Sequence, residues 1–440
     1  MRFFTQFISS VSIISLFPLL AWSGIPQVRN LKVLVDTETK RFLINYDLEN
    51  DTEDAIKVVF KVSYDGGRSF FDHSAEANGH VGFPVSSGTN RQITWNYEPS
   101  LSNEARELNE YRISISATDF SITGPREMIA RVDENKLRDG VEGMVGERNF
   151  SDAAGLKGIE VTRTLIEKSF RESGYKVLLN QFRYDTYNGI NYIGLRPGDA
   201  DTTKLIVICA HYDTVFGSPG ADDNASGVSV MLEISRVIAS YSFKYSILFV
   251  AFDLEEEGLL GSQYFVNKYL DKMQIEVLGV INLDMVGYYN KRRNSQNVPP
   301  TFAQQFPDLA RRVKRNKYRA DFVITTANAQ SAALSETFAI AAKTYTPRMK
   351  FLSIVAPGNG QDFQDLRQSD HASFWDREYT TISVGDGADT RNKFYHTKMD
   401  TLDKLDFTII TRVARAVLAT IATIAEPTGY SHAFATFTLK

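Results

Sequence analysis

Histidines and acidic residues recur in this 440-residue chain at points where an apolar run gives way to a loop. Imidazole nitrogen together with carboxylate oxygen suits zinc, whereas calcium prefers oxygen ligands alone. Two such cations about 3.5–4 Å apart, bridged by one carboxylate and one water, form a hydrolytic site. The sequence therefore predicts a hydrolytic centre with two zinc ions. Its candidate ligands are His211, Asp222, Glu256, Asp284 and His396.

Glu255 is the candidate for the catalytic base. It lies directly beside Glu256 but need not face the same metal ion. An unligated glutamate next to an activated water is what a general base requires. The single cysteine, Cys209, cannot form an internal disulfide. Its place in an apolar run favours a packing role, with a thiolate ligand as the alternative.

These residues follow predicted strands. The apolar runs Leu205–Ile208, Ile247–Leu254 and Val280–Leu283 each end shortly before a candidate residue. Sites in open α/β sheets lie at such carboxyl ends. Segments with helical spacing alternate with the strands, so we expect a mixed, mostly parallel sheet flanked by helices. The expected helices are 158–173, 226–240, 259–269, 329–342 and 407–424, and two earlier strands are 176–182 and 190–195.

Five blocks of the sequence resemble the signature blocks of the M28 family of zinc aminopeptidases. They occur in the family's order, and the similarity spans residues 145–425 or so. A complete set is far more specific than a lone His-x-Asp or Glu-Glu pair. The resemblance implies a metallopeptidase that hydrolyses N-terminal residues from peptides. The blocks are His211-Tyr-Asp213, Gly220-Ala-Asp-Asp-Asn-Ala-Ser-Gly227, Glu255-Glu-Glu-Gly-Leu-Leu-Gly-Ser262, Asn282-Leu-Asp284 and Tyr395-His-Thr397.

The resemblance also implies how the ligands are shared. Asp222 would bridge the two zinc ions. His211 and Asp284 would complete one zinc site, and Glu256 and His396 would complete the other.

Two acids would support the ligands in this resemblance. Glu255 would act as general base and then as general acid, and Asp213 would orient the His211 imidazole, a partner that ligating histidines usually have. The resemblance further implies a non-proline cis peptide between Asp222 and Asp223.

The chain divides into four predicted regions. Residues 1–23 combine a positive start, an apolar run and a small-x-small site, which predicts a signal peptide and export to the periplasm or outside the cell. Residues 25–122 contain short strands separated by turn signals, which predicts an all-β sandwich of immunoglobulin or fibronectin type. Residues 126–428 form the peptidase-like domain, and residues 429–440 form a tail. An uncleaved membrane anchor is the alternative for the first region.

The charge balance restricts the expected partners. The formal net charge is only −4, which favours neither nucleic acid nor an acidic membrane as a partner. We expect a peptide substrate and no integral membrane association. The basic run Arg311–Arg319 is predicted to be a solvated helix face. The sequence does not indicate what the sandwich binds.

Several residues keep structural alternatives. Asp222 could cap the next helix, and the acids from Glu255 onward could begin a helix favourably. Together, the five blocks argue against these alternatives. Asp370 and His371 could support the site, contact the substrate or simply pack, and Asp400 could orient the His396 region or cap a loop.

Three other functions remain open. The protein could be a relative that acts on a different bond, because glutaminyl cyclases and carboxypeptidases share much of this ligand set. A non-catalytic binding protein and a purely structural metal site are further alternatives, against which the intact base and ligand set argue. Three remaining histidines are assigned no role: His73 and His80 as surface or turn residues, and His432 in the tail.

Overall fold

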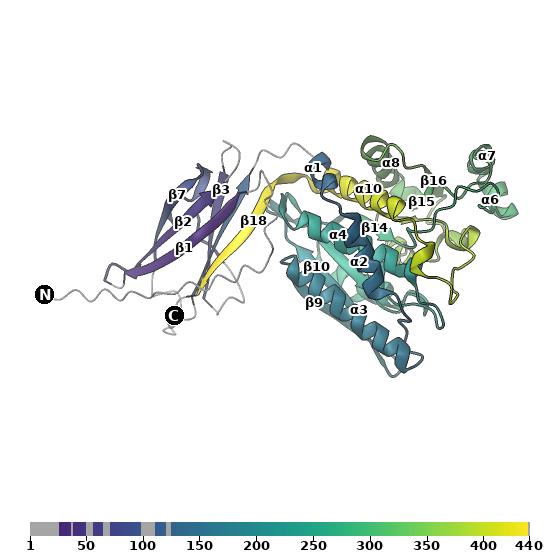
Figure 1. The fold of residues 1–440 in the computed structure, drawn as a ribbon, viewed down its shortest axis with the longest axis horizontal. Coiled ribbons are helices and arrows are strands. Elements are labelled where there is room, and N and C mark those ends of the chain that lie inside the picture. The colour runs from purple at the N-terminus through teal and green to yellow at the C-terminus, as the bar shows by residue number, and fades with distance from the viewer. Residues whose placement is uncertain are drawn as a thin grey trace. The chain divides into compact units, whose positions relative to one another are not determined.

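The computed structural model describes residues 26–36, 38–49, 56–64, 71–97, 111–119 and 125–438. The predicted signal peptide, residues 1–23, lies outside this described part. The chain forms two compact units, which are shown in Figure 1. The first contains Met1–Ile122, Ser240–Ser242 and Thr428–Lys440, and the second contains Thr123–Ala239 and Phe243–Pro427.

The first unit consists of two antiparallel sheets. Their strand orders are β1-β2-β7-β5 and β12-β18-β8-β3-β4, with β6 paired to β3. Alternate residues of the strands are buried, such as Phe42, Ile44, Tyr46 and Leu48 on β2, and they join side chains of β3 and β8 in one apolar core. The predicted sandwich architecture is therefore present. The strands are β1 (Gln27–Asp36), β2 (Arg41–Glu49), β3 (Ile56–Ser63), β4 (Phe71–Asp72), β5 (Asn78–Gly79), β6 (Gly82–Val85), β7 (Gly88–Asn96), β8 (Arg112–Asp119), β12 (Tyr241–Phe243) and β18 (Pro427–Thr438).

The C-terminal segment differs from its prediction. Residues 429–440 are expected from the sequence to be a tail, but β18 pairs antiparallel with β8 and belongs to the first unit. His432 lies opposite Ala117 in this pairing. The β-rich sequence Ala433–Thr438 is short and follows a helix, so only its partner strand, over 300 residues earlier in the chain, shows that it completes a sheet.

The second unit has a mixed sheet of eight strands in the order β16-β15-β17-β14-β11-β13-β10-β9. The central strands β17, β14, β11 and β13 are parallel, and β10 and β9 add an antiparallel edge. This confirms the predicted fold class. The strands are β9 (Lys176–Tyr184), β10 (Tyr187–Arg196), β11 (Asp201–His211), β13 (Tyr245–Phe252), β14 (Glu276–Leu283), β15 (Val323–Asn328), β16 (Phe351–Ala356) and β17 (Thr381–Gly385).

Helices cover both faces of this sheet. The view in Figure 1 is from the side on which α2, α3, α4 and α10 lie. On the opposite face, α5 and α9 pack through Phe265 and Phe374 against β11 and β13. The helices are α1 (Pro125–Ala130), α2 (Glu134–Met144), α3 (Ala153–Glu172), α4 (Gly227–Ile238), α5 (Leu260–Lys268), α6 (Pro300–Gln305), α7 (Pro307–Arg315), α8 (Ala332–Tyr345), α9 (His371–Trp375) and α10 (Phe407–Ala425).

Among the described residues, α10 is the one helix with the length and hydropathy of a membrane span. Buried residues make up 72% of its apolar stretch, because the helix packs against α8, α4 and the sheet. That burial is typical of the core helix of a globular domain.

Candidate metal centre

Three neighbouring parallel strands deliver an imidazole and acids to one edge of the sheet. His211 is the last residue of β11, and Asp284 directly follows β14. Glu255 lies three residues after the end of β13. Because β11 lies between β13 and β14 and is parallel to both, these carboxyl ends meet. The three side chains thus start from adjacent strand ends, where the sequence predicts the site.

The structure brings Asp223, and not Asp222, to the two histidines. Asp223 Oδ1 lies 3.4 Å from His211 Nε2, and Asp223 Oδ2 lies 3.1 Å from His396 Nε2. The Asp222 carboxylate instead accepts a hydrogen bond of 2.9 Å from the main-chain N–H of Gly287. The prediction that Asp222 occupies the bridging position is therefore wrong by one residue.

The backbone conformation explains this difference. The turn η2 (Ala221–Ser226) is not a regular helix, because Asp223 has φ −105° and ψ 92°. In an extended backbone, neighbouring side chains point to opposite sides. Asp222 is fully buried, and its Oδ2 accepts a 2.9 Å hydrogen bond from Asn392, four residues before His396. The cis peptide also lies one position later than predicted, between Asp223 and Asn224.

Two groups of three ligand atoms share Asp223. The first consists of His211, Asp223 and Asp284, and the second of Asp223, Glu256 and His396. His211 Nε2 is 3.4 Å from Asp284 Oδ1, and His396 Nε2 is 3.2 Å from Glu256 Oε2. Apart from the shared aspartate, these are the pairs that the sequence predicts for the two metal ions.

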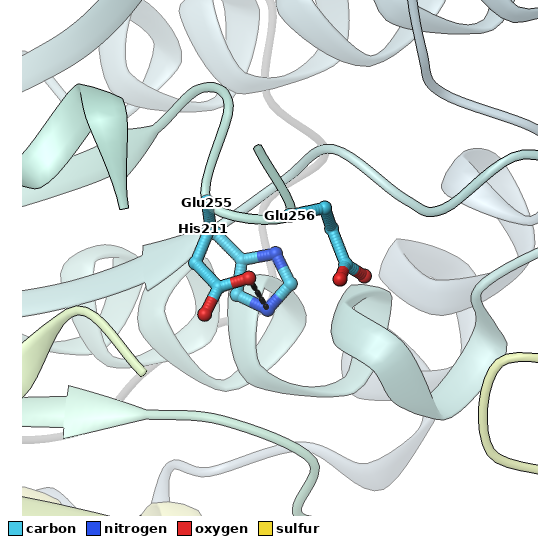
Figure 2. A group of neighbouring side chains, drawn as sticks. All are labelled: His211, Glu255 and Glu256. Atoms are coloured by element: carbon cyan, nitrogen blue, oxygen red, sulfur yellow. Dashed lines mark ion pairs between the residues drawn. The ribbon is translucent and has the colours of Figure 1, made fainter. Parts of the chain in front are cut away.

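Glu255 lies on the His211 side of this centre. Its Oε2 is 4.0 Å from His211 Nε2, as the dashed line in Figure 2 marks. Figure 2 also shows the Glu256 carboxylate at a separate position, so the adjacent glutamates present their oxygens at different points. Burial raises the pKa of Glu255 well above its usual value and outweighs the lowering effect of His211, while Asp370 and Asp284 add to the increase.

Asp213 supports both glutamates. Its Oδ1 accepts a hydrogen bond from the main-chain N–H of Glu255, and its Oδ2 accepts one from Glu256, each 3.1 Å long. Asp213 Oδ1 is also 3.5 Å from His211 Nδ1, which is longer than an ordinary hydrogen bond. The carboxylate therefore faces His211, as predicted, and in addition holds the backbone that carries the two glutamates.

Asp400 holds the backbone of the shared aspartate, Asp223, as Asp213 holds that of the glutamates. Its Oδ1 accepts a 3.0 Å hydrogen bond from the main-chain N–H of Asp222, and its Oδ2 accepts one of 3.1 Å from Asp223. Of the two roles open to Asp400 from the sequence, the structure thus shows loop capping, and the capped loop carries a candidate ligand.

The crowding of acids and imidazoles shifts their pKa values in opposite directions. Burial alone would lower the pKa of His396, but its hydrogen bonds with Asp223 and Glu256 raise it to about 10. Burial would raise the pKa of Asp223, but the two histidines lower it below its usual value. For Glu256, burial and the charge of Asp223 outweigh the lowering effect of the two histidines and raise the pKa to about 7. The acids and imidazoles of the centre therefore influence one another's ionisation through burial and close contact.

The donor atoms fit zinc. Two ligand atoms about 2.0–2.2 Å from one tetrahedral zinc lie roughly 3.3–3.5 Å apart, and the four ligand separations above are 3.1–3.4 Å. Asp284 Oδ1 and Glu256 Oε1 are buried without a hydrogen-bond partner in the described part of the chain. Buried carboxylates without partners are costly unless a cation or donor compensates them.

Other candidate residues surround the centre without joining either group. Cys209 is fully buried in the apolar core beneath β11, so its packing role holds. Asp370 is fully buried, and burial raises its pKa to about 7. His371 packs edge-to-face on Trp375, and its Nε2 donates a 2.8 Å hydrogen bond to the carbonyl of Leu366.

The sequence reasoning missed Arg148, a charged residue beside the centre. Arg148 lies between α2 and α3 and is fully buried, although arginine is rarely so without a paired acid. No spacing or apolar pattern around Glu147-Arg148-Asn149 distinguishes it from a surface arginine. Only the tertiary contacts identify it.

Comparison with known families agrees with this geometry. The model of Peptidase family M28 matches residues 191–421, more than half of the chain. This protein therefore belongs to peptidase family M28, and the predicted resemblance is confirmed.

This chain matches only part of the length of the individual relatives. The uncharacterized protein YfbL of Escherichia coli is 32% identical over 219 residues, which are 47% of this chain and 62% of YfbL. Aminopeptidase YwaD of Bacillus subtilis is 45% identical over 98 residues, which are 22% of each chain. The similarity thus spans less than two thirds of these relatives.

A solved structure supports the fold. The LapA aminopeptidase of Legionella pneumophila superposes with a TM-score of 0.53 and 23% identity, over 69% of this chain and 75% of LapA. At that identity the likeness shows a common fold.

Proposed function

We propose that this protein is a zinc-dependent aminopeptidase with two zinc ions per chain. The observation that carries the proposal is the placement of Asp223, whose two carboxylate oxygens each face one imidazole. Asp284 completes the His211 group and Glu256 the His396 group. A carboxylate shared in this way between two mixed nitrogen and oxygen ligand sets is typical of two-metal hydrolytic sites.

Zinc bound in these two groups would polarise the scissile carbonyl and make a water nucleophilic near neutral pH. The chain's own contribution is a proton carrier. The Glu255 carboxylate would take the proton of the attacking water and deliver it to the leaving amine. Asp213 accepts a hydrogen bond from the Glu255 main-chain N–H and so keeps the Glu255 carboxylate next to His211.

The preference for free N-termini is part of the proposal. It is supported by the name of the relative YwaD, an aminopeptidase with 45% identity over the matched segment. Export to the periplasm or beyond the cell is likewise proposed, on the strength of the signal-like residues 1–23.

The proposal is tested by zinc content and by hydrolysis of two kinds of substrate, a panel of aminoacyl p-nitroanilides and their N-acetylated forms. Three proteins are compared: the parent, Glu255→Gln and Glu257→Gln. Glu257 is the matched control, because it is exposed and belongs to neither ligand group. We expect two zinc ions in all three proteins and a loss of hydrolysis of about 10²–10⁴-fold in Glu255→Gln alone.

Two results would contradict the proposal. Zinc-loaded parent protein that cleaves neither kind of substrate would exclude the aminopeptidase activity and redirect the search to cyclisation or carboxypeptidase assays. Equal activity of Glu255→Gln and the parent would exclude Glu255 as the base.

A further inference from the structure

Arg148 is a fully buried arginine whose guanidinium donates hydrogen bonds to main-chain carbonyl oxygens. Its guanidinium reaches three separate segments: the end of α2, the residue between His211 and Asp213, and the loop that precedes Asp222. The hydrogen bonds run from Nε to Tyr212 (2.7 Å), from Nη1 to Met144 (2.7 Å), Gly146 (2.9 Å) and Pro219 (3.0 Å), and from Nη2 to Gly220 (2.8 Å).

This arrangement is unusual for a buried cation. Buried arginines normally pair with a carboxylate, because an unpaired charge in the interior is costly. Here no carboxylate accepts a hydrogen bond from the guanidinium in the described part of the chain. Burial lowers the pKa of Arg148 to about 10, so the side chain still carries its charge at neutral pH. The nearby acids Asp223, Asp400 and Asp213 oppose that lowering, which places the cation within their electrostatic reach.

The backbone of the same residue strengthens the connection. Arg148 N donates to Thr214 Oγ1, and Thr214 N donates to Arg148 O, both at 2.9 Å. Gly146 N donates a 2.9 Å hydrogen bond to Pro219 O. The packing around Gly220 leaves no room for a side chain. A Cβ atom on this residue would lie only 2.6 Å from Arg148 Nη2 and 2.4 Å from Asp223 O. The segment 146–148 therefore ties residues 212–214 to residues 219–220.

The two tied segments lie close in sequence to ligands of both metal groups. Tyr212 directly follows His211, and Gly220 lies three residues before Asp223. Three of the five acceptors, on Tyr212, Pro219 and Gly220, lie in these segments. Because a planar guanidinium donates in a rigid pattern, it fixes where both segments lie. A side chain with fewer donors would leave buried carbonyls unsatisfied and allow the segments to shift.

We infer that Arg148 is a positioning residue that sets the separation of His211 and Asp223, and thereby prepares the centre for zinc before the metal binds. The inference rests on the proposed zinc centre. It assigns Arg148 no contact with substrate or metal.

The test compares Arg148→Met and Arg148→Lys with the control Arg236→Met. Arg236 is a partly buried arginine that donates hydrogen bonds to Glu233 and to the carbonyl of Arg131, and to neither of the segments 212–214 and 219–220. The zinc dissociation constant is measured by competition with a chelator, at a temperature where circular dichroism shows every protein folded. Hydrogen exchange of peptides spanning residues 212–223 is measured on the zinc-free proteins.

We expect Arg148→Met to bind zinc at least tenfold more weakly than the parent, in the range found when residues that orient metal ligands are removed. Exchange of residues 212–223 should be faster in the same variant. Arg148→Lys should show a smaller loss, because lysine keeps the charge but has three donors without the planar fork. Arg236→Met should bind zinc within twofold of the parent, even where its thermal midpoint falls.

The inference is overturned if Arg148→Met binds zinc as tightly as the parent, or if Arg236→Met loses the same affinity. If Arg148→Met does not fold, Arg148→Lys decides by the same criteria. A parent protein that binds no zinc would refute the proposed function. The positioning role would then be judged by hydrogen exchange, and unchanged exchange in the Arg148 variants would refute it separately.

Discussion

The two halves of the candidate centre differ in how the fold supports them. The His211 half is built on strand ends, and the His211 side chain is 2% exposed. The His396 half is built on a loop: His396 has a positive φ of 57°, and its side chain is 35% exposed. The Tyr395 ring stacks on the His396 imidazole, with 3.7 Å between the ring centroids. One half is therefore prepared by the sheet, whereas the other depends on a loop and its aromatic neighbour.

This difference leads us to expect that the two halves differ in how tightly they hold zinc. The buried half, next to Glu255, holds its ligand atoms through β11 and β14, so it should bind zinc tightly and release it slowly. The exposed half can exchange ligands and water more readily. Asp223 belongs to both halves and connects their properties.

The largest effect is expected at the shared carboxylate. Asp223→Asn should weaken zinc binding in both halves by more than about 100-fold, because a direct ligand is lost. Asp222→Asn should cost only about tenfold, the range for residues that support metal ligands. The two variants differ by one position and carry the same chemical change, so isothermal titration with zinc compares them directly. Equal losses, or a larger loss for Asp222→Asn, would contradict the placement of Asp223 between the histidines.

The next effect distinguishes the two halves. On addition of an excess of chelator, zinc should leave the parent protein in two phases that differ at least tenfold in rate, the faster one from the His396 half. His396→Gln should abolish the fast phase and retain one slow zinc, while His211→Gln should remove the slow phase. Stopped-flow detection of the released metal measures both. A single phase, or loss of the slow phase in His396→Gln, would show that burial does not separate the halves.

The smallest effect concerns the surroundings of the buried half, where His371 lies. Burial lowers the pKa of His371 from 6.5 to about 4. The unfolded chain therefore binds a proton between these values when the folded chain does not, so stability is full above pH 6.5 and declines as the pH falls towards 4. Between pH 7.5 and pH 6, the contribution of His371 lowers the free energy of unfolding by about 0.8 kcal/mol.

Urea unfolding of the zinc-free parent and of His371→Gln at the two pH values measures this contribution. Glutamine can keep the hydrogen bond to the Leu366 carbonyl but does not titrate. The parent should lose about 0.8 kcal/mol more than the variant on acidification. If both proteins lose the same free energy of unfolding, His371 does not titrate as its burial implies.

The elements with strong periodicity were predictable from the sequence. The apolar runs before His211, Glu255 and Asp284 are strands, because parallel strands buried on both faces consist of continuous apolar residues. The amphipathic helices predicted at 158–173 and 407–424 correspond to α3 and α10 within a few residues. Local hydrophobic spacing carries this information without any knowledge of distant contacts.

The choice between Asp222 and Asp223 was not predictable in the same way. Both acids lie in one block, and either could face the histidines. The deciding factor is the irregular backbone of η2, which Asp400 holds from 177 residues further along the chain. Likewise, β18 becomes a strand of the sandwich only through pairing with β8.

The sequence by itself determined the kinds of residue at the centre, their order, the fold class and the family. The residue types and the fold class follow from chemistry and from local periodicity, and the family follows from the resemblance of the five blocks to those of M28. The tertiary structure alone decided which aspartate is shared, which main-chain N–H groups donate to Asp213 and Asp400, and that Arg148 is buried among carbonyl groups. Each of these depends on the direction of a side chain and on partners far away in the chain, and no local pattern specifies either.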